Sequence, residues 1–270
     1  MQTLQNTSNT ESCNIFQRIW AAFVFLTRLP LWRLYQPPKK AYESVVEFWP
    51  LTGWLTASIS ALVLYLVAPH SLILAPLAVI IVRVLLTGAL HEDGLADFFD
   101  GFGAGGEKQR ILTIMKDSHI GTYGVIALIL YFLTLFVCLS AICSINISTY
   151  GIYVILMADP FAKMLAAQTI ILMPYARKED ESKAKNIYRK PKLLSYIFLL
   201  LQGLIPLGFF IFKTGITIRE ILPIIILPIV ICTLLNLLIY KKLKGYTGDC
   251  NGAVFLLTEL SVYLTALFVL

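Results

Sequence analysis

The segment Tyr123–Ile142 reads YGVIALILYFLTLFVCLSAI and contains no charged residue. About twenty apolar residues are what an α-helix needs to cross the hydrocarbon core of a bilayer. The sequence therefore predicts an all-α, polytopic membrane helical bundle of about seven transmembrane helices, folded as a single domain over residues 1–270. The other six predicted spans are Pro50–Ala68, Leu72–Leu90, Tyr150–Met173, Leu193–Phe212, Ile221–Tyr240 and Ala253–Leu270.

Composition points to the same class. Of the 270 residues, 58% are hydrophobic and 14% are charged, whereas soluble domains carry about 25% charged residues. This apolar content excludes a disordered chain, and five cysteines without a CxxC pair argue against a disulfide scaffold or a zinc site. The stretch Ile15–Tyr35 is also apolar, but three arginines and a proline interrupt it, so we expect an interfacial helix there.

Basic residues predict the orientation. Most of the 22 Lys and Arg residues fall before the first span or in the loops 91–122, 174–192 and 241–252. The positive-inside rule therefore places these four segments in the cytoplasm and the C-terminus outside. This explains the net charge of +6 without a nucleic-acid partner, although the 174–192 cluster could also hold anionic lipid or a phosphorylated substrate. The four tryptophans are expected to form an interfacial belt: Trp20, Trp32, Trp49 and Trp54.

The most informative stretch is GALHEDGLADFFDGFG, Gly88–Gly103, directly after the second span. In a helix, the i, i+4, i+7 spacing of its aspartates places them on one face: Asp93, Asp97 and Asp100. Carboxylates so close together repel one another unless they are protonated or hold a cation, and oxygen ligands suit Mg²⁺ or Mn²⁺. The alternative is a solvated acidic face; the concentration of scarce acids at a membrane boundary favours a metal site.

Other charged residues extend this picture. Arg110 and Lys116 can bind phosphate oxygens or act as positive-inside anchors. Asp249 in the GYTGDCNG turn can be a further carboxylate of the metal site or a simple helix cap. Within the spans, Asp159 and Lys163 are spaced to pair with each other. The remaining two intramembrane charges, Arg83 and Glu259, can pair or face the site.

Several blocks resemble one known family, cobalamin synthase (adenosylcobinamide-GDP ribazoletransferase). They are Gly88–Gly103, Lys116–Gly124, the Gly248-Asp249 loop, FLTRLP at Phe25–Pro30 and FWPLTG at Phe48–Gly53. The resemblance covers most of the chain. It implies an Mg²⁺-dependent enzyme of the prokaryotic cytoplasmic (inner) membrane, active on the cytoplasmic side. Such an enzyme joins adenosylcobinamide-GDP to α-ribazole or α-ribazole 5′-phosphate and releases GMP.

On this basis we expect Asp93, Asp97 and Asp100 to hold the metal, with Asp249 as a further ligand or as the base. The expected substrate-binding residues are Arg28, Arg110, Lys116, Asp117 and His119. The lipid bilayer is the remaining expected partner, and assembly into a homo-oligomer stays open.

Two alternative functions are compared with the sequence. A CDP-alcohol phosphotransferase does analogous chemistry, but it would have an arginine where Phe98 stands and a second Asp-x-x-x-Asp pair. A cation transporter would place acids at mid-membrane and show repeat symmetry, whereas most acids here lie at the predicted cytoplasmic boundary.

Overall fold

The computed structural model describes residues 13–146, 150–177 and 188–270, and within them the regular elements are helices. The described α-helices are α1 Ile15–Leu26, α2 Trp49–Val67, α3 Leu74–Thr87, α4 Leu90–Ala104, α5 Lys108–Ile114, α6 Thr122–Asn146, α7 Ile152–Leu172, α8 Leu193–Thr214, α9 Ile218–Leu243 and α10 Gly248–Val269. Two 3-10 segments, η1 Leu31–Arg33 and η2 Lys39–Phe48, join α1 to α2. The predicted all-α class is confirmed.

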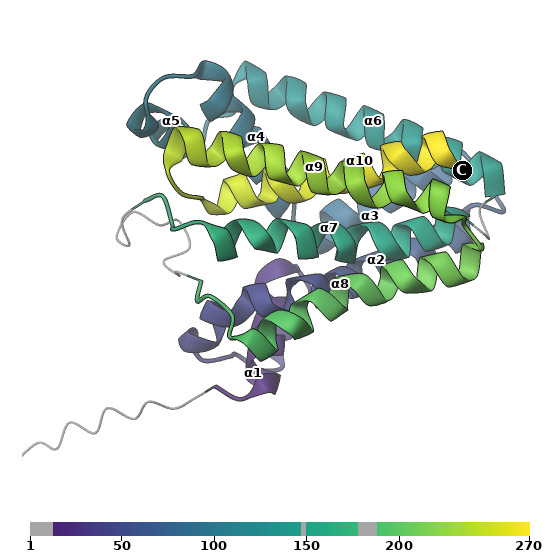
Figure 1. The fold of residues 1–270 in the computed structure, drawn as a ribbon, viewed down its shortest axis with the longest axis horizontal. Helices are drawn as coiled ribbons and strands as arrows, with labels where there is room; N and C mark the ends of the chain where they lie inside the picture. The colour runs from purple at the N-terminus through teal and green to yellow at the C-terminus, as the bar shows by residue number, and fades with distance from the viewer. Residues whose placement is uncertain (1–12, 147–149, 178–187) are drawn as a thin grey trace, which may run out of the picture.

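Six of these helices are long and apolar enough to cross a membrane: α2 (continuous with η2), α6, α7, α8, α9 and α10. They run side by side along the long axis of the molecule (Figure 1). α7 and α10 are the most enclosed, whereas α8 and α9 expose most of their apolar surface. An apolar outer surface of this extent is what a lipid environment requires.

The predicted second span, Leu72–Leu90, is wrong as a continuous helix. α3 has 14 residues, a rise of only about 21 Å at 1.5 Å per residue, against about 30 Å of hydrocarbon. The chain then turns by 90° into α4. Gly88 and Ala89, with φ of 64° and 57°, both take the left-handed conformation that produces this turn. Among the described residues, the bundle thus has six continuous helices long enough to span and one broken pair.

The helix predicted over Ile15–Tyr35 is shorter than expected, since α1 ends at Leu26 and the 3-10 segment η1 follows it. α1 has 12 residues, too few to span. The Asn14 side chain accepts a hydrogen bond from the backbone N–H of Gln17 at its start, and Thr27, in extended conformation, ends it. α1 packs on η2 at one end of the bundle, where the Arg18 guanidinium pairs with Glu47.

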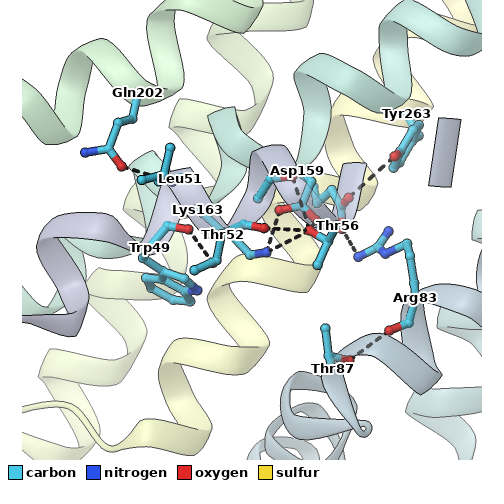
Figure 2. A network of polar contacts seen from close by, with 12 residues as sticks. Trp49, Leu51, Thr52, Thr56, Arg83, Thr87, Asp159, Lys163, Gln202 and Tyr263 are labelled. Carbon is cyan, nitrogen blue, oxygen red and sulfur yellow. Dashed lines mark hydrogen bonds and ion pairs between the residues drawn. The ribbon is translucent and has the colours of Figure 1, made fainter. Parts of the chain in front are cut away.

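Two buried ion pairs lie within the bundle (Figure 2). Lys163 Nζ is 2.7 Å from Asp159 Oδ1 on α7, as the i, i+4 spacing predicts, and Thr56 of α2 donates to Asp159 Oδ2 at 2.6 Å. Arg83 of α3 donates to Glu259 of α10 at 2.6 Å. Charges in an apolar interior are tolerated only when paired in this way. These contacts hold α2 to α7 and α3 to α10.

The two ends of the bundle differ in charge. α5 and the α9–α10 connection lie at one end, and the C-terminus lies at the other (Figure 1). Lys108, Arg110 and the lysines Lys241, Lys242 and Lys244 belong to the first end. Three members of the 174–192 cluster lie outside the described residues: Lys178, Lys183 and Lys185.

Candidate functional site

A cavity of ≈ 180 Å³ lies where the N-terminal ends of α4 and α10 meet. Residues from α1, η2, the start of α2 and the end of α7 complete its wall. Two of the predicted site carboxylates, Asp93 and Asp249, are among its lining residues. Its apolar and aromatic members are Phe25, Leu26, Val45, Val46, Trp49, Leu90, Ile170, Tyr175 and Tyr188, and its polar members include His91, Arg177 and Asn251.

Two glycines let α4 and α10 approach at this cavity. A Cβ added to Gly94 would lie 2.9 Å from the Asp249 carbonyl oxygen and 3.0 Å from the Asp249 Cα. A Cβ on Gly252 would lie 3.1 Å from the carbonyl oxygen of His91. Only backbone stands at these distances, so neither neighbour can rotate away. The glycines therefore bring Asp93, next to Gly94, beside the first turn of α10.

We expect Gly94→Val to lower kcat for the GMP release that the family resemblance implies by about 10-fold or more, because a displacement of about 1 Å near reacting groups can cost on the order of 100-fold. Gly208→Val on α8 is the control, since a Cβ there meets nothing within 4 Å. Steady-state rates of GMP release by both variants check this. Equal rates would show that catalysis does not need the close approach of α4 and α10.

Asp249 is not the cap of α10. The Thr247 hydroxyl accepts the hydrogen bond from the Cys250 N–H and caps the helix. The Asp249 carboxylate instead lies 3.8 Å from the Arg177 guanidinium, and their side chains are 15% and 3% exposed. Of the two alternatives for Asp249, the structure therefore removes the simple cap and leaves a carboxylate at the cavity.

A short bridge between distant segments places Arg177. After α7 ends, the Ala176 N–H donates to the Tyr246 carbonyl at 2.8 Å, and the Tyr246 N–H donates to the Pro174 carbonyl at 2.9 Å. The rings of Tyr175 and Tyr246 contact each other edge to face. This bridge fixes the end of α7 against the turn before α10, so Arg177 reaches Asp249.

Two tyrosines around the bridge stay neutral. Burial raises the pKa of Tyr188 and of Tyr246 well above the usual range for a phenol. Tyr188 lines the cavity, so it offers a hydroxyl and an aromatic face there rather than a charge.

The aspartates of α4 share one face but have different surroundings. Asp93 is exposed and lines the cavity, Asp97 is half-buried, and Asp100 is buried. Both Asp100 oxygens are used: the Gly121 N–H donates to one at 2.6 Å and the Gly124 N–H to the other at 2.8 Å. Asp100 thus anchors the start of α6 to α4.

We expect Asp100→Ala to destabilise the protein by about 1–3 kcal/mol, because it leaves two backbone N–H groups near α6 without their acceptor. Thermal unfolding in detergent measures this. A variant as stable as the wild type would show that these hydrogen bonds contribute nothing to the fold.

In the described ranges, no three His, Cys, Asp or Glu side chains are grouped so as to share a metal ion. The predicted set of four carboxylates is therefore not gathered at one point in this structure. Asp93 and Asp249 are the pair that lines a common cavity.

The predicted substrate-binding residues lie outside this cavity. Arg28 packs over Gly88 at the α3–α4 turn, and Arg110 and Lys116 are exposed in and after α5. Asp117 and His119 are exposed as well, and they pair with each other at 2.7 Å. The His119 backbone N–H and ring both hydrogen-bond the Asp117 carboxylate and lower its pKa.

Sequence reasoning missed three members of the wall. Arg177 was one of seven basic residues in a single loop, and nothing in that run distinguishes it. Trp49 was expected in an interfacial belt, but it is 5% exposed and lines the cavity. Asn251 could have been predicted, because it follows Asp249 by two residues and both lie in the first turn of α10.

Comparisons with known proteins identify a family for this chain. Residues 18–267 match the model of the family described as cobalamin-5-phosphate synthase. A protein of Leptospira interrogans named adenosylcobinamide-GDP ribazoletransferase is 33% identical over 258 residues, covering 92% of this chain and 94% of its own. One of the same name from Shewanella amazonensis is 36% identical over 255 residues, covering 91% and 93%. No solved structure matches.

The family model and these relatives both cover far more than half of the chain, including the α4 and α10 segments that build the cavity. The resemblance to this family is thus confirmed over residues 18–267. The chain belongs to the cobalamin-5-phosphate synthase family, whose members are transferases of cobalamin biosynthesis.

Proposed function

We propose that this protein joins adenosylcobinamide-GDP to α-ribazole, or to α-ribazole 5′-phosphate, in an Mg²⁺-dependent reaction that releases GMP. The observation that carries the proposal is the meeting of Asp93 and Asp249 at one cavity, on two helices held together by glycines. The relatives are named adenosylcobinamide-GDP ribazoletransferase, and this name supports the choice of donor and of a ribazole-type acceptor.

The carboxylates at the cavity fit Mg²⁺. This ion is usually held by one or two carboxylates together with water and substrate phosphates, so Asp93, with Asp97 one turn further along α4, is sufficient. We assign these two as ligands and Asp249 as the proton acceptor beside them. Asp100, committed to two backbone N–H groups, is assigned to positioning α6. When bound, Mg²⁺ would neutralise charge on the donor diphosphate.

The reaction is a phosphoryl-type transfer. A hydroxyl of the acceptor attacks the phosphorus nearer cobinamide, a new P–O bond forms, and the P–O bond to GMP breaks. Such reactions depend mainly on positioning and on neutralising charge. Asp249 would accept the proton of the hydroxyl, and Arg177, 3.8 Å away, would hold a phosphate oxygen.

We propose that the exposed residues outside the cavity bind and orient the donor, which is the larger substrate. Arg110 and Lys116 would bind its diphosphate, while Arg28, Asp117 and His119 would orient it. α5, which carries Arg110, lies at the same end of the bundle as the α9–α10 connection (Figure 1), and the start of α10 lines the cavity. The donor is too large for ≈ 180 Å³, so part of it must lie outside the cavity.

We also propose that the cavity end of the bundle faces the cytoplasm of a prokaryotic inner membrane and that the C-terminus lies outside. The concentration of lysine and arginine at the cavity end supports this orientation. Nucleotide substrates are cytoplasmic molecules, which agrees with it.

The test is GMP release by the purified protein in detergent, without any ion gradient, from adenosylcobinamide-GDP plus α-ribazole. We expect release that requires Mg²⁺ and falls by at least about 100-fold in Asp93→Asn, because a ligand of the charge-neutralising ion is lost. Glu107→Gln, an exposed acid outside the cavity, is the matched control. A folded wild type without turnover would contradict the proposal and favour a transporter.

A further inference from the structure

Several buried polar atoms of the cavity wall have no hydrogen-bond partner. In the described part of the chain, 12 buried side-chain N or O atoms have no hydrogen-bond partner. Four of them belong to cavity-lining residues: Trp49 Nε1, His91 Nε2, Arg177 Nε and Asn251 Oδ1. Each of these residues is less than 9% exposed. A buried polar group without a partner costs free energy, so this wall is complementary to a ligand that supplies the missing partners.

The four atoms define what the ligand must offer. Trp49 Nε1 and Arg177 Nε can only donate, so the ligand needs acceptors. Asn251 Oδ1 can only accept, so the ligand needs a donor as well. His91 Nε2 can do either, according to its tautomer. The ligand therefore carries both ring or sugar acceptors and at least one hydroxyl or N–H.

The rest of the wall favours a flat apolar body without charge. Trp49, Tyr175 and Tyr188 contribute aromatic rings, and the His91 ring lies 4.8 Å from that of Phe255 and 6.0 Å from that of Trp49. The charged lining residues are two acids and one arginine. The proposed function assigns these three to the reacting phosphate, the metal and the proton, which leaves the aromatic part of the wall to an uncharged body.

We propose that this cavity binds the heterocyclic base and ribose of the acceptor, with His91 and Asn251 as positioning residues that hydrogen-bond to it. A riboside of an aromatic nitrogen heterocycle has a ring nitrogen that accepts, hydroxyls that donate and accept, and a flat apolar body. This inference rests on the proposed function and names the substrate that occupies its site. The exposed cationic residues outside would bind most of the donor nucleotide, and its reacting phosphate would meet the acceptor at Asp93, Asp249 and Arg177.

The experiment separates the two substrates. Binding of α-ribazole alone is measured by calorimetry on the detergent-purified protein, and the KM values for both substrates are measured separately. We expect His91→Leu and Asn251→Leu each to weaken α-ribazole binding by about 10-fold, as loss of one buried hydrogen bond predicts. The KM for adenosylcobinamide-GDP should change by less than about 2-fold. His70→Leu, an exposed histidine outside this cavity, is the matched control.

The outcomes distinguish this inference from the proposed function. If the wild type turns over and the KM for adenosylcobinamide-GDP rises while α-ribazole binding is unchanged, the cavity holds the donor and the inference is overturned. The inference is also overturned if the wild type turns over and the variants change neither α-ribazole binding nor the KM of either substrate. If α-ribazole binds and the variants weaken it, but no GMP is released, the cavity assignment stands and the proposed function fails. An unchanged KM for the donor shows that each variant is folded.

Discussion

Asp249→Asn is expected to lower kcat for GMP release by at least about 100-fold, the loss typical when a positioned proton acceptor is removed. Asparagine keeps the size of the side chain, but it can neither take a proton nor neutralise a cation. The Thr247 cap does not depend on Asp249, so α10 should still form. Rates at saturating substrates and Mg²⁺, together with thermal unfolding, check both statements.

The matched control for this change is Glu107→Gln, which removes one exposed carboxylate outside the cavity. Its kcat should stay within about 2-fold of the wild type, as expected for a surface site away from the chemistry. An Asp249→Asn variant as active as this control would remove Asp249 from the chemistry and leave its contact with Arg177 as a structural one.

Breaking the ion pair between α3 and α10 should have the largest effect on stability. Glu259→Leu leaves the Arg83 guanidinium buried without its carboxylate, and loss of one partner of a buried pair costs about 3–5 kcal/mol. Arg83→Met combined with Glu259→Leu removes both charges and should recover most of this loss. Unfolding free energies in detergent micelles measure the cycle.

The double variant is the informative member of that cycle. If it is as unstable as Glu259→Leu alone, the loss comes from packing at Glu259 and not from an uncompensated charge on Arg83. If Glu259→Leu is as stable as the wild type, the pair contributes nothing to holding α3 against α10.

The spans could be predicted from sequence because their cause is local. An apolar run of sufficient length must form a helix in lipid, whatever surrounds it. The break between α3 and α4 could not be predicted in this way, because the run Leu72–Leu90 is apolar apart from Arg83 and Thr87 and is long enough to span. Its cause is the left-handed backbone at Gly88 and Ala89, and a helical pattern tolerates an isolated glycine.

The site was predictable in part for the same reason. The spacing of the α4 aspartates is local, and the structure does place them on one helix. Asp100, however, binds backbone groups more than 20 residues away, at Gly121 and Gly124. Arg177 reaches Asp249 only because a bridge joins the end of α7 to Tyr246. Such long-range contacts leave no periodic pattern in the chain.

The most direct test of the account is whether Asp93 and Asp249 serve one site. GMP release is measured under single-turnover conditions for Asp93→Asn, Asp249→Asn and the double variant. Groups that act as a unit are strongly non-additive, so the double variant should lie within about 3-fold of the slower single variant. Losses that multiply would show that the two carboxylates act independently, and the shared site between α4 and α10 would be contradicted.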